Sequence, residues 1–276
     1  KMEIKEFMAG IQHLKINFFT GVPDSQLKAL CDFLTSTYGT GSKHIVAANE
    51  GAAVGLATGH FLASGHPALV YMQNSGIGNA VNPICSLINE KVYAIPVLFV
   101  IGWRGEPGVK DEPQHLFQGE ITTKLLECLE IPYFVCTTST TQEVFWQAVR
   151  EAENAFAKGK SFAFLIRKNA LEQGQKTAYE NSYSLTREAA IEAVLQSSQE
   201  SDVFVSTTGK LSRELFELRE KFGHGHGKDF LTVGSMGHAS MIALGIALEK
   251  RERLICCFDG DGALLMHMGS MAILGA

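Results

Sequence analysis

Short runs that are apolar at every position recur along the first half of the chain, with helix-length segments between them. Continuous apolarity, rather than alternation, is typical of strands that are covered on both faces in a parallel sheet. The predicted strands are 44–48, 68–72, 96–101, 134–137 and 162–166. The predicted helices are 25–38, 50–64, 79–89 and 140–158. This order of strand and helix predicts a doubly wound α/β domain.

A second, shorter α/β pattern follows a polar segment. Residues 169–184 are rich in Gln, Glu and Lys and show little periodicity, which predicts a linker. Beyond it we predict strands at 203–206, 231–233 and 254–258 and helices at 186–199, 211–221 and 238–250. The chain is therefore divided into a first domain, 1–168, and a second domain, 185–276. Because fewer strands are visible in the second domain, we expect it to be incomplete.

The charge of the chain excludes some classes of partner. With a formal net charge of -5 and a pI near 6.0, it lacks the basic runs with interleaved aromatic residues that bind nucleic acid. No stretch reaches the roughly 18 apolar residues of a membrane span, and the N-terminus is too polar for a signal peptide. We therefore expect a cytoplasmic protein that acts on a small molecule, without nucleic-acid or membrane partners.

The sharpest local motif is Gly260-Asp261-Gly262-Ala263, which follows the predicted strand 254–258 and opens a helical pattern. Glycines let the backbone approach a phosphate, a helix start offers free N–H groups, and Asp261 can hold a hard cation between phosphate oxygens. Two other predicted strands of this domain lead into small or hydroxyl residues, at 206–210 and 234–239. Three such strand ends on one sheet predict a diphosphate site, and three unrelated turns are the alternative.

In the first domain, Glu50 lies in the first turn of the helix that follows strand 44–48. Its neighbours, which include Ala48, Ala52 and Ala53, are small and apolar, so they can desolvate the carboxyl group. A carboxyl that stays protonated in such a setting can donate to a ring nitrogen of a ligand. The plainer alternative is a glutamate that only complements the helix dipole.

These features together resemble the thiamine diphosphate enzymes, in which a pyrimidine-binding and a diphosphate-binding domain share one fold. More specifically, four motifs resemble the phosphonopyruvate decarboxylases, with sulfopyruvate decarboxylases as nearest relatives. The motifs are Gly21-Val22-Pro23-Asp24-Ser25, Asn49-Glu50-Gly51-Ala52-Ala53, Gln73-Asn74-Ser75-Gly76-Ile77-Gly78-Asn79 and Gly234-Ser235-Met236-Gly237-His238-Ala239. The resemblance implies that 3-phosphonopyruvate is decarboxylated to phosphonoacetaldehyde in phosphonate biosynthesis, with thiamine diphosphate and Mg²⁺ as cofactors. Decarboxylation of sulfopyruvate, the sulfonate analogue, or of another 2-oxo acid is the alternative.

The resemblance also implies roles for residues of these motifs. Glu50 would protonate the pyrimidine ring, Met236 would hold the cofactor bent, and Asp261 would bind Mg²⁺. The Asn-Asn pair that normally completes the metal shell in the superfamily would lie beyond Ala276, so that ligand is not assigned. The cofactor would lie between subunits, which implies a homo-oligomer of at least two chains. The other expected cofactor-binding residues are Thr208, Gly209, Ser235, Gly260, Gly262 and Ala263.

We expect Asp24 and His115 to handle protons after decarboxylation. Asp24 follows Pro23 in a turn where we expect a strand to end, and an ordinary turn or helix-capping aspartate is the alternative. His115 lies in a predicted loop, 102–119, and a loop of that length inside a compact domain is more often functional than not.

The same predicted loop carries cations that suit a doubly charged phosphonate. Arg104 could hold the phosphonate with two parallel hydrogen bonds, and Lys110 could add a point charge. A solvated charged loop is the alternative. We count Ser25 and Asn74, from two of the matching motifs, with the substrate-binding residues.

Two functions of other classes are open at this point. A nicotinamide-binding oxidoreductase would also use strand-glycine-helix turns, but the chain lacks a good Gly-x-Gly-x-x-Gly with an acidic residue about 20 positions later. A non-catalytic module that binds a nucleotide or another partner is the second. Replacing Glu50 by Gln separates these classes, because an enzyme should lose turnover and a binding module should be indifferent.

Overall fold

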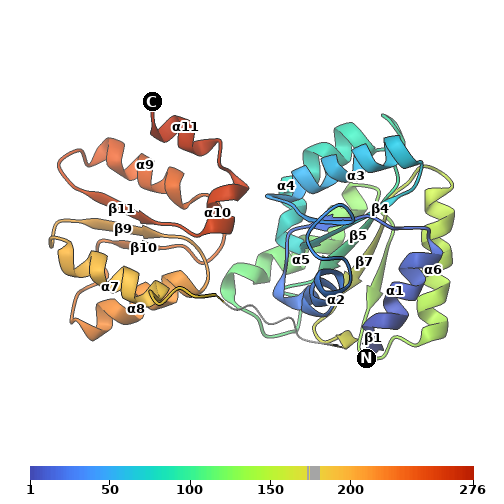
Figure 1. Cartoon of the computed structure of the whole chain (residues 1–276), viewed down its shortest axis with the longest axis horizontal. Helices are drawn as coiled ribbons and strands as arrows, with labels where there is room; N and C mark the ends of the chain where they lie inside the picture. Colours follow the sequence, from blue (N-terminus) through green and yellow to red (C-terminus); the bar gives the residue numbers. More distant parts are fainter. Residues whose placement is uncertain (173, 175–180) are drawn as a thin grey trace. The chain divides into compact units, whose positions relative to one another are not determined.

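The computed structural model describes residues 1–172, 174 and 181–276 and divides the chain into two compact units, Lys1–Ala178 and Tyr179–Ala276 (Figure 1). The strands of each main sheet are parallel, and helices cover both faces of each sheet. The predicted α/β class, with two doubly wound parallel sheets, is therefore confirmed. Part of the predicted linker, residues 173 and 175–180, lies outside the described residues.

The sheet of the first unit has six parallel strands in the order β3-β2-β4-β5-β7-β6. Every residue of β5 and β7 is buried, which is why these strands are apolar without alternation. A short parallel pair, β1 (Met2–Glu3) and β8 (Leu171–Glu172), stands apart from the main sheet. The six strands are β2 (Phe19–Gly21), β3 (His44–Val46), β4 (Ala68–Gln73), β5 (Val97–Gly102), β6 (Tyr133–Cys136) and β7 (Phe162–Ile166).

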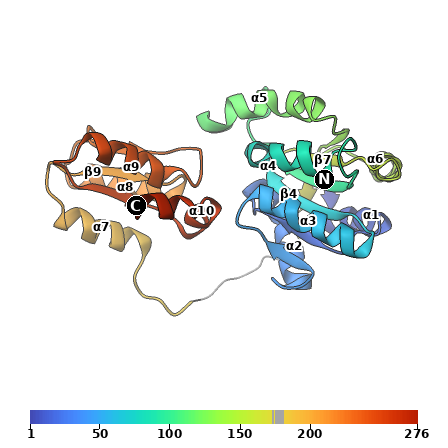
Figure 2. The same ribbon diagram turned by 90° about the horizontal axis from the view of Figure 1, so that it is seen from above.

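Helices cover both faces of this sheet and create two separate cores. Leu69 and Tyr71 of β4 face the core under α1, α2 and α6, while Val70 and Met72 face the core under α3 and α4. Figures 1 and 2 show α3 and α4 together over one face of the sheet. The helices are α1 (Ile4–His13), α2 (Lys28–Tyr38), α3 (Glu50–Ser64), α4 (Ile77–Pro83), α5 (Pro113–Cys128) and α6 (Gln142–Phe156). Short helical turns are η1 (Ser25–Leu27), η2 (Asn74–Gly76) and η3 (Ile84–Ile88).

The prediction that residues 102–119 form a loop is wrong for the second half of that segment. Helix α5 begins at Pro113, a residue whose fixed φ suits the first helical position. The helix escaped prediction because its apolar residues do not form one face. Leu116 and Phe117 are 44% and 71% exposed, while Leu126 is buried. His115 therefore lies in the first turn of a helix rather than in a loop.

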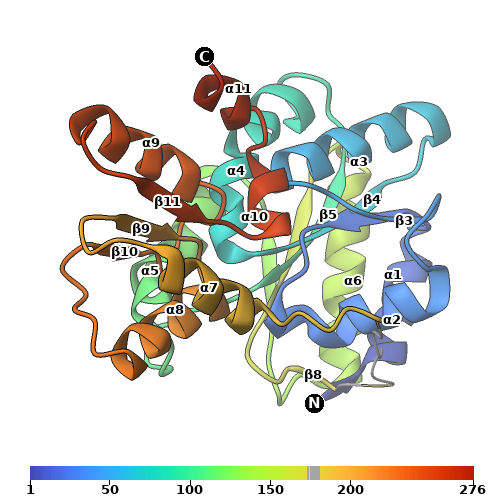
Figure 3. The ribbon, with the colours of Figure 1, turned by 60° about the vertical axis from the view of Figure 1, so that its left-hand side comes forward.

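The second unit has a three-stranded parallel sheet in the order β10-β9-β11. Figure 3 shows it between α9 on one face and α7 and α8 on the other. The strands are β9 (Val203–Ser206), β10 (Asp229–Leu231) and β11 (Ile255–Phe258). The helices are α7 (Arg187–Ser197), α8 (Lys210–Lys221), α9 (Ala239–Glu249), α10 (Asp261–Met266) and α11 (Ser270–Leu274). In the part of the chain that the structure describes, no helix has the length and apolarity needed to cross a membrane.

Candidate active site

Four residues that the sequence singled out lie just beyond strand ends at one edge of the first sheet. Asp24 follows β2, Glu50 follows β3, Asn74 follows β4 and Arg104 follows β5. Because these strands are parallel and adjacent, their carboxyl ends share one edge, which is where open α/β sheets bind ligands.

Glu50 is buried, with only 5% of it exposed, and it is held in place from two sides. The Asn49 side chain caps α3 by accepting a hydrogen bond from the Ala52 backbone N–H at 2.8 Å, which fixes where the helix begins. Asn79 donates from Nδ2 to Glu50 Oε2 at 2.7 Å. A Cβ atom at Gly76 would lie 2.4 Å from Glu50 Oε1, so only glycine leaves room for this carboxyl group.

Asp24 is 8% exposed and is held in a comparable way. Its Oδ1 accepts from the Gln26 backbone N–H at 3.0 Å, and its Oδ2 accepts from Gln73 Nε2 at 2.8 Å. Ser75 Oγ in turn donates to Gln73 Oε1 at 2.8 Å, which orients the amide. A Cβ at Gly102 would stand 2.5 Å from Asp24 Oδ1. A second carboxyl group at this edge is therefore fixed by its neighbours.

Arg104 is engaged by a carboxylate of its own chain. Its Nε donates to Asp111 Oδ2 at 2.8 Å and its Nη2 to Oδ1 at 2.5 Å. These hydrogen bonds raise the pKa of Arg104 and hold the pKa of Asp111 well below its usual range. The sequence predicts that Arg104 holds a substrate anion with two parallel hydrogen bonds. In the structure Arg104 makes those two hydrogen bonds with Asp111. Arg104 Nη1 points to Ser25 Oγ at 3.4 Å.

Asn74 is fully buried, and its amide is used by the protein itself. Its Oδ1 accepts from the Arg104 backbone N–H at 3.1 Å, and its Nδ2 donates to the Arg104 carbonyl at 2.8 Å. Nδ2 also donates to Thr122 Oγ1 at 2.9 Å. Asn74 thus fixes the backbone that carries Arg104.

His115 shares this edge with four charged groups. Burial lowers the pKa of His115, and the charge of Arg104 acts in the same direction, while Asp111, Asp24 and Glu112 act in the opposite one. The imidazole of His115 is therefore neutral at pH 7. Lys110 is exposed and has no ion-pair partner among the described residues.

In the second unit, the loops after the three strands gather at the carboxyl edge of that sheet. The Thr207 backbone N–H donates to the Phe258 carbonyl at 2.8 Å, which ties the end of β9 to the end of β11. Met236, in the loop after β10, is 39% exposed, and its Cε lies 3.2 Å from the Cβ position of Gly262. A Cβ at Gly237 would lie 3.2 Å from the Ala263 carbonyl. The loop after β10 therefore packs on the start of α10.

The side chain of Thr207 indicates what this edge can bind. Its Oγ1 is buried and has no hydrogen-bond partner among the residues that the structure describes. A buried hydroxyl without a partner costs free energy, and an oxygen of a bound phosphate would satisfy it. Thr208 and Gly209 continue the same turn, and Gly209 has a φ of +88° that favours glycine. Ser235, at the corresponding strand end of β10, has a φ of +54°. The edge thus fits a phosphate group.

Asp261 is the first residue of α10 and is exposed, and its Oδ1 accepts from the Gly262 backbone N–H at 2.8 Å. Within residues 1–172, 174 and 181–276, no three His, Cys, Asp or Glu side chains form a group that could hold a metal ion. Mg²⁺ commonly binds through one or two carboxylates together with phosphate oxygens and water. Asp261 beside a bound diphosphate is compatible with that pattern.

Several residues of these two edges escaped sequence reasoning. Gln73, Gly76 and Asn79 lie inside a motif that was recognised, but their contacts with Asp24 and Glu50 depend on how β4 and α4 pack. Thr207 adjoins Thr208, and only its burial distinguishes it.

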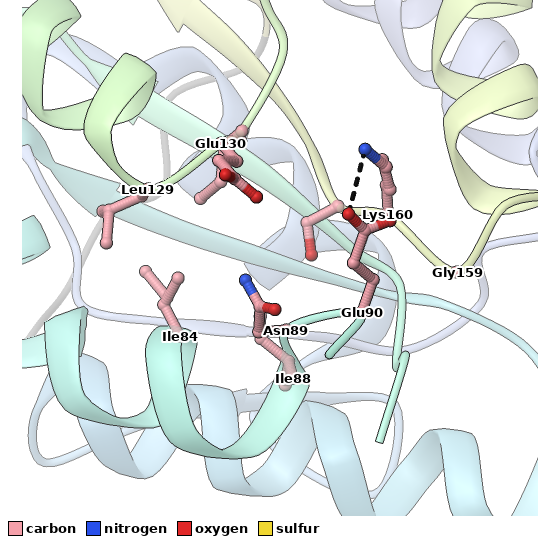
Figure 4. A pocket seen from close by; sticks show the side chains of 10 residues that line it. Ile84, Ile88, Asn89, Glu90, Leu129, Glu130, Gly159 and Lys160 are labelled. Carbon is pink, nitrogen blue, oxygen red and sulfur yellow. Dashed lines mark ion pairs between the residues drawn. The ribbon is translucent and has the colours of Figure 1, made fainter. Parts of the chain in front are cut away.

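A small hollow at the other edge of the first sheet is a poor substrate site. Ile84 and Leu129 line it, and Lys160 Nζ pairs with Glu90 at 3.1 Å across it (Figure 4). Its volume is about 20 Å³, which is enough for about one water molecule. It is formed by segments that precede β5, β6 and β7, away from the carboxyl ends.

Both units of the chain match domains of known proteins. Residues 5–126 match the family of thiamine pyrophosphate enzymes through its N-terminal TPP binding domain, and residues 207–275 match the C-terminal TPP binding domain. The chain is 33% identical to phosphonopyruvate decarboxylase of Streptomyces viridochromogenes, over 98% of this chain and 69% of that protein. It is 41% identical to the alpha subunit of sulfopyruvate decarboxylase of Methanococcus maripaludis, over 43% of this chain and 68% of that subunit.

Solved structures are also similar to this chain, and benzoylformate decarboxylase is one of them. Benzoylformate decarboxylase from Polynucleobacter necessarius matches with a TM-score of 0.46 and 12% identity. The match covers 74% of this chain, and this chain spans 38% of that one.

Proposed function

The chain belongs to the phosphonopyruvate decarboxylase family of thiamine diphosphate-dependent carboxy-lyases, and we propose that it decarboxylates 3-phosphonopyruvate to phosphonoacetaldehyde. The observation that carries the proposal is the carboxyl edge of the first sheet. There Glu50 is fixed by Asn79 and Gly76, and Asp24 is fixed by Gln73. The identity to the Streptomyces enzyme over nearly the whole chain supports the substrate.

Thiamine diphosphate, when bound, supplies the carbanion and the electron sink that the loss of carbon dioxide requires. Glu50 would hold a proton on its carboxyl group and share it with the pyrimidine ring. The hydrogen bond from Asn79 Nδ2 to Oε2 and the contact with Gly76 orient that carboxyl before the ligand arrives. Such preorganisation removes the cost of reorienting the group during the reaction.

The strand ends of the second unit would hold the diphosphate. We propose that Thr207, Thr208, Gly209 and Ser235 offer hydroxyl and backbone N–H groups to its oxygens. Gly260, Gly262 and Ala263 would border it at the start of α10, and Met236 would contact the cofactor. Asp261 would bind a Mg²⁺ ion that also contacts the diphosphate.

Asp24 and His115 would provide the proton that replaces the lost carboxylate on the product carbon. Because burial lowers the pKa of His115, its imidazole is neutral at pH 7 with one ring nitrogen free to receive a proton from solvent, and the protonated ring would release that proton readily. The hydrogen bonds from Gln26 and Gln73 keep the Asp24 carboxyl in one orientation for that transfer. Asn74 acts indirectly in this proposal, since it fixes the backbone of Arg104.

The test is a comparison of two substrates. The protein, supplied with thiamine diphosphate and Mg²⁺, is incubated with 3-phosphonopyruvate or with sulfopyruvate, and carbon dioxide release gives kcat/KM for each. A higher kcat/KM for 3-phosphonopyruvate supports the proposal. A higher value for sulfopyruvate would instead make the protein a sulfopyruvate decarboxylase. Sulfopyruvate is tested as the rival substrate because the chain is also similar to the alpha subunit of sulfopyruvate decarboxylase. Turnover of neither acid contradicts both assignments.

The metal, the assembly and the location belong to the same proposal. Activity should disappear after chelation of Mg²⁺ and return when Mg²⁺ is added back. The protein should elute as at least a dimer, which size-exclusion chromatography with light scattering measures. A fully active monomer would contradict the proposed homo-oligomer. We propose a cytoplasmic location, which fractionation of the source cells tests.

A further inference from the structure

A cationic cleft opens beside Asp24 in the first unit. It lies between the start of α2, the loop after β5 and the loop after β7, and its volume is about 320 Å³. Lys28, Arg104 and Lys168 line it together with the Ser25 hydroxyl group. Three cations from three separate segments therefore meet in one hollow at the carboxyl edge of the sheet.

The three cations differ in how far they are neutralised. Arg104 is paired with Asp111, which also lines the cleft, and Lys28 Nζ lies 2.6 Å from Asp32 Oδ2. Lys168 is exposed and has no ion-pair partner in the part of the chain that the structure describes. Among the residues that line the cleft, three are cations and one, Asp111, is an anion, and Lys168 is the cation that has no ion-pair partner among the described residues.

The position of the cleft relates it to the reacting groups. Ser25, which lines it, directly follows Asp24 in the sequence, and Arg104 Nη1 lies 3.4 Å from Ser25 Oγ. Gln26, which also lines the cleft, donates its backbone N–H to Asp24 Oδ1 at 3.0 Å, so the cleft adjoins Asp24. An anion in the cleft would thus lie next to the groups assigned to proton transfer.

We propose that this cleft binds the phosphonate group of the substrate, with Lys168 and Lys28 as the principal cations. The inference rests on the proposed function. Lysine is suited to this role, since its ammonium group is a point charge on a flexible stem that can reach an anion from the rim. Arg104, already oriented by Asp111, contributes Nη1, and Ser25 contributes its hydroxyl group. Lys110, which the sequence suggested, does not line the cleft.

The same arrangement predicts how the site separates a phosphonate from a sulfonate. A phosphonate near neutral pH carries up to two negative charges, and a sulfonate carries one. The Coulomb energy with each lysine scales with the charge of the ligand, so a site with an uncompensated cation favours the dianion. Lys168 is thereby a specificity-determining residue.

The experiment compares Lys168→Gln and Lys28→Gln with Lys158→Gln. Lys158 is an exposed lysine of the same unit that does not line the cleft. Each variant is assayed for kcat and KM with 3-phosphonopyruvate and with pyruvate, which lacks the terminal anion. Binding of methylphosphonate and of methanesulfonate is measured separately by calorimetry, without turnover. Circular dichroism checks that each variant is folded.

We expect Lys168→Gln to raise KM for 3-phosphonopyruvate about 10-fold to 100-fold, as the loss of one charge-assisted contact implies. The ratio of kcat/KM for 3-phosphonopyruvate to that for pyruvate should fall by a similar factor. Lys28→Gln should act in the same direction, and Lys158→Gln should match the wild type. Methylphosphonate should bind the wild type more tightly than methanesulfonate, and Lys168→Gln should reduce that difference.

Failure of this inference can be told apart from failure of the proposed function. A wild type that turns over 3-phosphonopyruvate, with KM unchanged in both Lys168→Gln and Lys28→Gln, overturns the cleft assignment and leaves the function standing. A wild type that does not turn over 3-phosphonopyruvate, but binds methylphosphonate in a Lys168-dependent manner, overturns the function and supports the anion site.

Discussion

The two units present their candidate functional groups in different ways. In the first unit these groups are side chains, Glu50 and Asp24, which are buried and held by hydrogen bonds and by close contacts with glycines. In the second unit they are mainly backbone groups of strand ends, together with the hydroxyl group of Thr207 and the exposed carboxylate of Asp261. The contrast suggests that the first unit orients proton chemistry and the second unit provides cofactor affinity. Substitutions in the first should therefore change turnover, and those in the second should change binding.

The largest effect is expected from Glu50→Gln in the first unit. Loss of a positioned acid–base group typically costs between about 100-fold and 10,000-fold in rate, so kcat should fall into that range while cofactor affinity changes little. Glu143→Gln is the matched control, because Glu143 also lies in the first turn of a helix but is exposed. If both variants retain full activity in the decarboxylation assay, Glu50 only complements the helix dipole.

Gly76→Ala tests whether close packing positions Glu50. The added Cβ would lie 2.4 Å from Glu50 Oε1, so the carboxyl group must shift. A misplacement of about 1 Å can lower the rate about 100-fold. Gly78→Ala is the control, since a Cβ there meets nothing within 4 Å and alanine favours the helix. Equal kcat values for the two variants would show that the contact with Gly76 is not needed for turnover.

Thr207→Val tests the second half of the contrast. The variant should bind thiamine diphosphate about 10-fold more weakly, because one hydrogen bond to the diphosphate is lost, while kcat at saturating cofactor is retained. Without cofactor, the free energy of unfolding should stay the same or rise, since the replaced hydroxyl group has no hydrogen-bond partner in the described part of the chain. Thr20→Val removes a similar unpartnered hydroxyl group from β2 and should leave affinity unchanged. Calorimetry that finds identical affinities in all three proteins would remove Thr207 from the cofactor site.

The smallest effect concerns the pH dependence of His115. Burial lowers its pKa, so its resonance in an NMR titration should have a midpoint below the ordinary value of about 6.5. The folded state disfavours the imidazolium form, so the contribution of His115 to stability is present above pH 6.5. It is lost as the pH falls from 6.5 towards the lowered pKa. A midpoint at or above 6.5 would contradict the burial of this ring.

Much of the fold followed from the sequence where local pattern and tertiary environment agree. Strands β7 and β9 and helix α3 were predicted with the bounds that the structure gives, since each is a compact apolar or capped segment. Helix α1 was missed, and so was α5, because the exposed Leu116 and Phe117 interrupt its apolar face. Strand β2, which is three residues long, was not among the predicted strands, although Asp24 was expected to follow a strand end.

The sequence predicted the chemical groups of the candidate site, but it did not predict the residues that hold those groups in place. Glu50, Asp24 and Asp261 stand in motifs, so the resemblance could assign them roles. Their supporting partners act through contacts between segments that lie far apart in the sequence, such as Gln73 with Asp24. The pairing of Arg104 with Asp111 likewise depends on how the loop after β5 folds back, and it changes what Arg104 can offer a substrate.

The most direct test of this account is a calorimetric titration of the protein with thiamine diphosphate in the presence and absence of Mg²⁺. We expect saturable binding that requires Mg²⁺, becomes weaker in Thr207→Val and persists in Glu50→Gln. Absence of any thiamine diphosphate binding by the wild-type protein with Mg²⁺ present would contradict the account.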